Sequence, residues 1–266
     1  MSLTWNKKFY FYLSLVFLLL FFPFCLSVQA KEDQEETAEK ITPMDLSAEE
    51  FLRIVRNPPG RESWAKMTGK ASHKRKNSRT VEAPLRLGIL FTPARTVAQI
   101  VFDEGEYYDL GQSYGENPTS TLESACTAGK TPRLGVFGIA PQDLTMGFLY
   151  QPLLREEKSD SVRGETCRVF SMRSPDGKGR TKVYISARFF FPLKAEFFSS
   201  QGDLTQKNSA EPERTLEISG FTKENDFWIV KSLNLFGPDW RTRIDFDKTE
   251  AGFTSDSLPA DVFLKH

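Results

Sequence analysis

Apolar and polar residues alternate along most of the chain from Trp64 onward, which is the period of β-strands with one buried face. The clearest early run places apolar side chains at every second position of residues 85–91. Similar runs lie at residues 96–102, 107–112, 166–172, 182–187, 192–198, 214–220, 227–236 and 241–247. Short polar turns such as residues 103–105 and 237–239 separate most of them, which favours antiparallel neighbours. The sequence therefore predicts an antiparallel meander.

One short helix is expected before the strands. Ser47 and Glu50 have the spacing of a capping box, in which each side chain bonds the other residue's backbone N–H. An apolar stripe follows in residues 51–55, and Pro58-Pro59-Gly60 ends it.

A second helix is expected in the middle of the chain. Residues 113–141 are rich in Gly, Pro, Ser and Thr and are predicted to contain no strand. Pro141 then suits the first position of a helix that runs to Leu149. Its apolar residues are expected to cover the sheet as a lid, and they are Leu144, Met146, Phe148 and Leu149.

The first thirty residues have the layout of a cleavable secretory signal. Lys7 and Lys8 precede an uncharged run to Val28, and Ala30 ends it with the small residue that a cleavage site needs. The alternative is an uncleaved anchor in the inner membrane, because the run is long enough to span a bilayer. We expect residues 1–30 to be the signal, 31–44 a disordered acidic leader, and 45–266 a single domain.

Without Lys7 and Lys8, 33 basic residues remain against 35 acidic ones, so the exported chain is close to neutral and no nucleic-acid partner is expected. Cys25 leaves with the signal. Cys126 and Cys167 remain as an even pair in an oxidising compartment, which predicts a disulfide between them. Two buried free thiols are the alternative.

The sequence contains few residues of the types that catalytic sites use. The only histidines are His73 and His266, which removes most metal sites and catalytic triads. The carboxylates of residues 103–109 are interpreted as a polar turn, in preference to an acid/base pair or a calcium site. No catalytic residue, metal or cofactor is therefore expected.

Residues 70–79 form a basic stretch that could dock an anionic membrane surface or an acidic partner. A solvated hairpin tip is the alternative, because charge clusters at turns are usually surrounded by water.

Phenylalanine is abundant, with 17 of the 23 residues outside the signal. Residues 189–191 are all Phe, and three adjacent rings cannot share one side of a strand, so they lie on a bent connection or cover both faces. Strand alternation gives a set of apolar positions predicted to share one face, as core or as the lining of a cavity. They are Leu87, Ile89, Val183, Ile185, Leu193, Phe197, Leu233, Leu235, Ile244 and Phe246.

Several segments resemble outer-membrane lipoprotein-sorting proteins of the LolA-like group, over about residues 64–263. The matching segments, in order, are residues 143–149, 164–169, 183–185, 191–198, 201–204, 228–231, 241–244 and 258–263. The resemblance implies an α+β fold, in which one strongly curved antiparallel sheet forms a half-open barrel with helices covering its concave face. Carriers of this group use an arginine to hold the lid shut, and the resemblance does not give that role to Arg53, Arg56, Arg86 or Arg95.

The same resemblance implies a periplasmic, non-enzymatic carrier that shelters lipoprotein acyl chains or another lipid in the apolar half-barrel. Inner- or outer-membrane sorting components would be its partners, and the chain is expected to act as a monomer. The alternative is a protein-interaction or lipid-sensing module of the same fold, with a filled core, acting through residues 70–79. A hydrolase is disfavoured by the shortage of histidine.

Overall fold

The computed structural model describes residues 42–56, 62–113, 119–174, 177–199, 211–224 and 227–265. The predicted signal and residues 31–41 of the predicted leader lie outside this part of the chain. Within the described residues, no helix has the length and apolar character needed to cross a bilayer.

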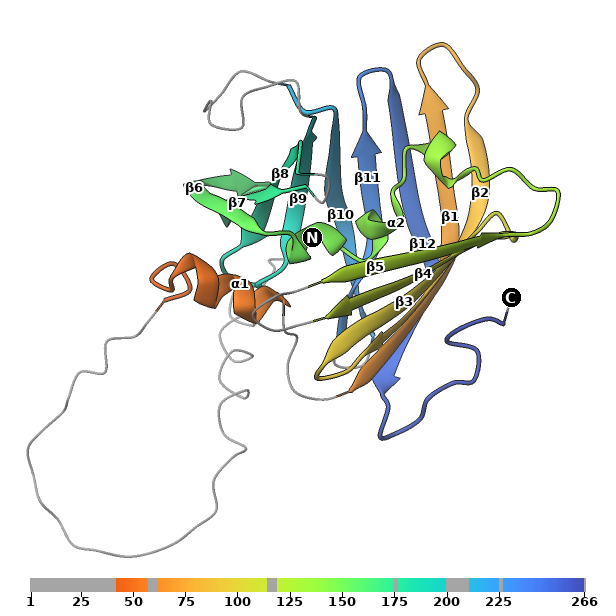
Figure 1. The fold of residues 1–266 in the computed structure, drawn as a ribbon, viewed down its shortest axis with the longest axis horizontal. Coiled ribbons are helices and arrows are strands. Elements are labelled where there is room, and N and C mark those ends of the chain that lie inside the picture. The colour runs from red at the N-terminus through yellow and green to blue at the C-terminus, as the bar shows by residue number, and fades with distance from the viewer. Residues whose placement is uncertain are drawn as a thin grey trace, which may run out of the picture. The chain divides into compact units, whose positions relative to one another are not determined.

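The described strands form one antiparallel sheet of twelve, in the order β5-β4-β3-β2-β1-β12-β11-β10-β9-β8-β7-β6 (Figure 1). Their bounds are β1 Ser63–Arg75, β2 Val81–Phe91, β3 Arg95–Phe102, β4 Glu106–Ser113, β5 Ser120–Cys126, β6 Leu153–Val162, β7 Glu165–Arg173, β8 Arg180–Ser186, β9 Pro192–Phe198, β10 Arg214–Glu224, β11 Phe227–Phe236 and β12 Trp240–Phe253. β5 and β6 are the two edges, so the described sheet is open. The predicted class, α+β with a single curved antiparallel sheet, is confirmed.

In the described part of the chain, four short helical segments accompany the sheet: α1 Ala48–Arg56, the 3₁₀ turn η1 Leu134–Phe137, α2 Pro141–Leu144 and the 3₁₀ turn η2 Gly147–Tyr150. The capping box that begins α1 is confirmed. The Glu50 N–H donates to Ser47 Oγ at 3.2 Å, and the Ser47 N–H donates to Glu50 Oε2 at 3.1 Å. The Ser47 hydroxyl also donates to Glu50 Oε2 at 2.7 Å, and this bond, followed by the one from the Ser47 N–H, lowers the pKa of Glu50.

Every predicted strand is present, and β9 and β11 have the predicted bounds. Three further strands, β1, β5 and β6, were not predicted as such. β5 lies in residues 113–141, so the prediction that this segment has no strand was wrong. Six of its seven residues are exposed, because it is an edge strand, and it therefore lacks the apolar alternation that marks a strand with one buried face.

One face of the sheet, here called the inner face, packs against the four helical segments. Together they form a single large apolar cluster that draws on nearly every strand. Its bulkiest fully buried side chains are Phe51, Phe102, Phe137, Phe148 and Phe170. The helical segments α1, η1, α2 and η2 are called the cover from here on, because their apolar side chains close this face.

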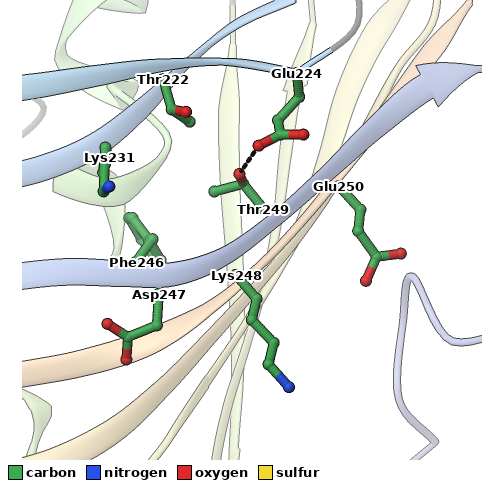
Figure 2. A pocket seen from close by; sticks show the side chains of 8 residues that line it. All are labelled: Thr222, Glu224, Lys231, Phe246, Asp247, Lys248, Thr249 and Glu250. Atoms are coloured by element: carbon green, nitrogen blue, oxygen red, sulfur yellow. Dashed lines mark hydrogen bonds between the residues drawn. The ribbon is translucent and has the colours of Figure 1, made fainter.

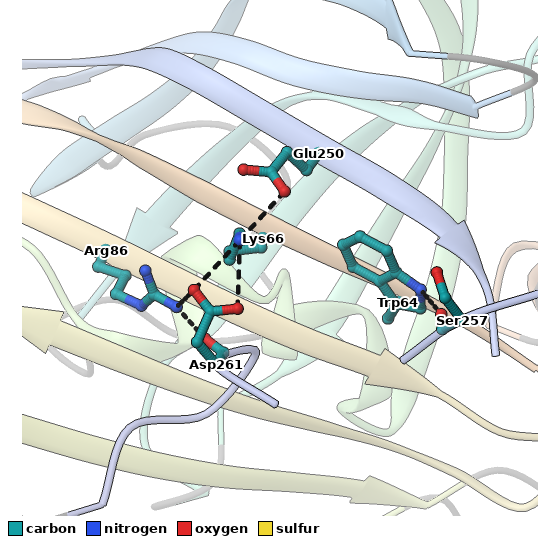
Figure 3. A network of polar contacts seen from close by, with 6 residues as sticks. All are labelled: Trp64, Lys66, Arg86, Glu250, Ser257 and Asp261. Atoms are coloured by element: carbon teal, nitrogen blue, oxygen red, sulfur yellow. Dashed lines mark hydrogen bonds and ion pairs between the residues drawn. The ribbon is translucent and has the colours of Figure 1, made fainter. Parts of the chain in front are cut away.

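The opposite, outer face of β1–β3 is crossed by residues 254–265, here called the C-terminal strap. Trp64 Nε1 donates to the Ser257 carbonyl at 2.6 Å, and Lys66 Nζ lies 3.2 Å from Asp261 Oδ2 (Figure 3). Arg86 also bonds Asp261, and Gln99 donates to the Leu264 carbonyl at 3.0 Å and accepts its N–H at 2.7 Å. Residues 258–263, the last segment that resembles the LolA-like group, lie within this strap.

Candidate functional site

The inner face is where the sequence placed the candidate cavity. Eight of the ten predicted residues are buried in the main cluster: Leu87, Ile89, Val183, Ile185, Leu233, Leu235, Ile244 and Phe246. Phe197 is half-buried against the same cluster. Strand alternation therefore identified the inner face across β2, β8, β9, β11 and β12.

Leu193 does not join them. Tyr184 lies opposite Lys194 in the β8–β9 ladder while Ile185 lies opposite Pro192, so Leu193 is the extra residue of a bulge. A bulge breaks strict alternation. The Leu193 side chain packs with Cys167, Val169 and Tyr184 in a separate small cluster, so its predicted place on the inner face was wrong.

The predicted covering helix is two short pieces. α2 ends at Leu144, Met146 adopts a left-handed backbone conformation with φ 56°, and η2 begins at Gly147. A non-glycine residue in that conformation cannot continue an α-helix. Leu144, Phe148 and Leu149 are nevertheless buried in the main cluster and Met146 is half-buried against it, so these residues do cover the inner face.

The three adjacent phenylalanines lie on the bent connection between β8 and β9. Phe190, at φ 52°, turns its ring onto Phe51 of α1 with ring centres 5.0 Å apart, and Phe51 also stacks on Phe170 at 5.7 Å. Phe191 meets Phe221 edge-on, while Phe189 is 59% exposed. Each of the three rings therefore has a different environment, and the middle one, Phe190, packs against α1.

The interior is filled by the cover. Phe51 and Leu52 of α1, with Phe137 and Phe148 of the middle segments, are at most 1% exposed. Beside α2 lies a cavity of about 290 Å³, lined by Ala140, Gln142, Asp143, Phe148, Gln151, Ser174, Thr181, Phe197 and Arg214. Any ligand that lies along the inner face must therefore displace part of the cover.

Arg168 fixes the start of α1. Its Nε and Nη2 form a paired contact with the Glu156 carboxylate, each at 2.7 Å. Its Nη1 donates to the carbonyls of Pro43 at 3.1 Å and Leu46 at 2.8 Å. The guanidinium also lies 4.6 Å from the centre of the Phe51 ring. One almost fully buried cation therefore joins the sheet, the N-terminal turn and the main aromatic ring of α1.

Arg56 fixes the other end of α1. Its Nε donates to the Leu149 carbonyl at 2.6 Å and its Nη2 to the Gln151 carbonyl at 2.9 Å. Burial lowers the pKa of Arg56, although the group stays a cation. Through this residue α1 and η2 are tied to each other, so the two parts of the cover are mechanically coupled.

α2 is tied to the sheet by an ion pair. Arg214 of β10 reaches Asp143 with Nη1–Oδ2 and Nη2–Oδ1 distances of 2.6 and 2.9 Å. Asp143 also accepts the Ala140 N–H at 2.7 Å, and Arg214 lies 3.9 Å from the centre of the Phe197 ring. A paired contact of this kind fixes orientation as well as position.

η1 is held by a chain of three residues. Thr242 Oγ1 donates to the Phe137 carbonyl, so it accepts the bond from His73 Nδ1, 2.8 Å away. The His73 ring lies between Phe137 and Trp240, and burial, followed by the nearby Arg75 charge, lowers the pKa of His73 below its usual 6.5. The neutral ring with its proton on Nδ1 is therefore the form that fits.

The basic stretch at residues 70–79 is divided between two settings. Lys70 to Arg75 belong to β1, where Lys70 pairs with Glu82 and His73 is buried. Only Lys74, Arg75, Lys76 and Arg79 are cations exposed at the end of the β1–β2 hairpin. The stretch is therefore a smaller basic surface than its sequence indicates.

The predicted disulfide is not formed, and both cysteines are free thiols. Cys126 ends β5 and its Sγ donates to the Lys130 carbonyl at 3.2 Å. Cys167 lies on β7, in the small cluster on the other side of the sheet from the main core. The two strands are not neighbours in the sheet order, which is why the even pair does not meet.

The acidic turn at residues 103–109 has a structural role. Glu106 is buried and accepts backbone N–H groups from Arg133 and Leu134 as well as the Tyr108 hydroxyl. Burial, and then the bond to Glu106, raise the pKa of Tyr108 to about 12. Among the described residues, no group of three or more His, Cys, Asp or Glu side chains could hold a metal ion.

Comparison with known proteins gives similarity in fold. No protein-family model and no curated protein matches the chain. A structure described as an outer-membrane lipoprotein-sorting protein domain from Vibrio parahaemolyticus superimposes with a TM-score of 0.57 at 15% identity, over 81% of this chain and 96% of that one. A DUF1329 family protein from Desulfovibrio piger gives 0.55 at 16% identity, over 81% and 93%. A LolA superfamily protein from Nitrosomonas europaea gives 0.49 at 15% identity, over 83% and 98%. At these identities the likeness to the first two structures establishes a shared fold, that of the lipoprotein-sorting protein domain, and nothing about the role of this chain.

Proposed function

We propose that this chain is a non-enzymatic carrier that shelters acyl chains of a lipoprotein, or another lipid with the same chains, between the inner face and the cover. Its place would be the periplasm, where it would contribute to sorting lipoproteins to the outer membrane. The LolA-like fold supports the class of protein. The observation that carries the proposal is the construction of the interior from two separable parts.

The first part is the sheet, whose inner face is apolar across β1–β4 and β7–β12. The second is the cover, whose segments contact that face through side chains and whose polar ties are few. Arg168, Arg214 and Thr242 supply the main ones, while Arg56 ties α1 to η2 within the cover. A ligand that replaces the cover side chains would find a continuous apolar surface already in place.

The energies of the two states are similar in size. Burying the apolar side chains that α1, α2 and η2 place in the main cluster, namely Phe51, Leu52, Leu144, Phe148 and Leu149, is worth about 8–15 kcal/mol, at about 1.5–3 kcal/mol each. An acyl chain of about fourteen methylenes gains about 11 kcal/mol on burial, at about 0.8 kcal/mol each. Exchange of cover for ligand is therefore close to balanced, as a carrier that must also release its ligand requires.

Export rests on the sequence of residues 1–30, with the uncleaved inner-membrane anchor as the alternative. We propose no enzyme function because the chain has few residues suited to catalysis, and the candidates are engaged in structural contacts. His73 is buried and engaged with Thr242, and the buried Glu106 and Asp143 hold backbone and arginine partners.

A second candidate is a lipid-sensing or protein-interaction module of the same fold, without transport. The observation that favours it is the group of exposed cations at the end of the β1–β2 hairpin, namely Lys74, Arg75, Lys76 and Arg79. Such a surface suits an acidic partner or an anionic membrane.

The deciding experiment is mass spectrometry of material extracted from the purified protein, together with titration by the fluorescent fatty acid cis-parinaric acid. The carrier predicts a copurified acyl lipid that parinaric acid displaces. A module without transport predicts neither, and capture of its partner that fails when Lys74, Arg75 and Lys76 are changed to Glu.

A further inference from the structure

The sheet is split between two of its central strands. β11 and β12 pair from Ser232 opposite Asp245 to Phe236 opposite Arg241. Beyond Ser232, residues 227–231 of β11 continue beside β10, and residues 246–253 of β12 continue beside β1. In the described ladder, residues 227–231 of β11 and residues 246–253 of β12 are therefore not paired with each other, which leaves a split between the two strands.

The free side of this split is the end of the β10–β11 hairpin, here called the flap: residues 221–224 of β10 and 227–230 of β11. The flap joins the rest of the sheet at two register shifts beside Gly220, where Ser219 and Lys231 fall out of the ladder. Bulges bend a strand and interrupt its ladder. Two bulges at the same level make this the natural hinge of the hairpin.

Among the described residues, a hydrogen bond and a ring contact join the flap to β12. Thr249 Oγ1 donates to Glu224 Oε1 at 2.8 Å, and this bond bridges β10 and β12 (Figure 2). The Phe227 and Phe253 rings lie 4.9 Å apart. The described flap is also held by the burial of Ile229 and by the ring contact between Phe221 and Phe191, whereas the cover is held to the sheet by Arg168, Arg214 and several fully buried rings.

A cavity of about 370 Å³ occupies the split (Figure 2). It is lined by Thr222, Glu224, Lys231, Phe246, Asp247, Lys248, Thr249 and Glu250. The rim is polar, but Phe246 is a member of the main cluster and only 2% exposed. The cavity therefore borders the main cluster at Phe246, behind which lies the interior that the proposed ligand would occupy.

The flap also carries exposed aromatic rings. Ile229 on its inner side is buried in the main cluster, while Trp228 on its outer side is 71% exposed and Phe221 is 38% exposed. Rings with one apolar side and one wet side are typical of surfaces that meet lipid. Trp228 lies on β11, which borders the split, while Phe221 lies on β10 and packs against Phe191.

We propose that the split between β11 and β12 is a lateral portal for a single unbranched acyl chain, which passes into the interior while the flap swings outward at Gly220. The portal rests on the proposed function, since it leads a lipid to the inner face. The cavity lies at the small end of ligand sites, so it suits one chain in transit.

The test clamps the split. Glu224→Cys with Thr249→Cys, in a chain that carries Cys126→Ser, would be bridged by a short bis-maleimide, and uptake of cis-parinaric acid would be followed by stopped-flow fluorescence. Uptake should slow at least tenfold on bridging, with equilibrium binding unchanged. The matched control is Asn234→Cys with Arg243→Cys, which bridges the same two strands where they are paired, and bridging there should change nothing.

A second variant moves the rate in the other direction. Thr249→Val removes the hydrogen bond to Glu224 and should speed uptake by about fivefold, as loss of one hydrogen bond from the closed state implies. Thr249→Ser keeps the hydroxyl and should match the unchanged chain. Uptake at the unclamped rate in the bridged chain would overturn the portal and leave the carrier intact, whereas absence of parinaric acid binding in every form would overturn both.

Discussion

Arg56 Nε donates to the carbonyl of Leu149 at 2.6 Å, although the two residues are 93 positions apart in the chain. This contact joins the last turn of α1 to η2, so the two ends of the cover cannot leave the inner face independently. The sheet itself is untouched by the bond. Release of the cover is therefore a coupled event, and its stability can be tuned without disturbing the strands.

Arg56→Met should loosen the cover. Charge-assisted bonds to two carbonyls are lost, for which we expect a decrease of about 1–3 kcal/mol in the free energy of unfolding. Hydrogen exchange in residues 48–56 should accelerate more than exchange in β11 or β12. Arg53→Met is the matched control on the same helix, because Arg53 is exposed. Equal acceleration of exchange in both variants would contradict a role of the Arg56 bonds in holding α1 to η2.

Gly88→Ala should displace the C-terminal strap. A Cβ at this position would lie 1.9 Å from the Val262 carbonyl oxygen, which is backbone and cannot rotate away. Overpacking of this kind typically costs about 1–3 kcal/mol, measurable by urea denaturation. Gly135→Ala is the control, since its added Cβ would have no neighbour within 4 Å. A Gly88→Ala protein as stable as the control would mean that the strap does not lie on β2.

The pH dependence of stability should carry a contribution from His73. Burial and Arg75 lower its pKa in the folded state below 6.5, with Asp239 acting in the opposite direction, so the unfolded chain binds more protons below that pH. Stability from this residue is present above pH 6.5 and decreases as the pH falls toward the folded value. His73→Asn keeps a donor toward Thr242 but cannot titrate in this range. The stability difference between the two proteins should shrink on acidification, and a constant difference would refute the assignment.

The two free thiols should differ sharply in reactivity. Burial raises the pKa of Cys167 to about 11, which keeps it a protonated thiol, while Cys126 is half-exposed. A maleimide should therefore label Cys126 in the folded protein and Cys167 only in urea. An intact mass lower by two hydrogens under non-reducing conditions would instead show a disulfide.

The faces of the strands could be predicted from the sequence because alternation is a local property. Leu233 and Leu235, or Val183 and Ile185, are separated by two positions and share a face wherever the ladder is regular. Ser47 and Glu50 gave the start of α1 for the same reason, since a capping box is local.

The features that were missed depend on pairing or on distant contacts. The bulge that turns Leu193 to the outer face is visible only when β8 and β9 are aligned. β1 was obscured by its basic residues, which project outward or pair with Glu82, and β5 by its position at the edge. Arg56 and Arg168 hold α1 through hydrogen bonds to backbone carbonyls, and such bonds leave no residue pattern in the sequence.

The central claim is that lipid and cover compete for the same inner face. Hydrogen exchange measured by mass spectrometry, with and without saturating cis-parinaric acid, tests it most directly. We predict that the ligand binds, that residues 48–56 and 141–150 lose protection, and that the inner-face strands β11 and β12 gain it. Binding that leaves the cover fully protected, or failure of the fatty acid to bind at all, would contradict the account.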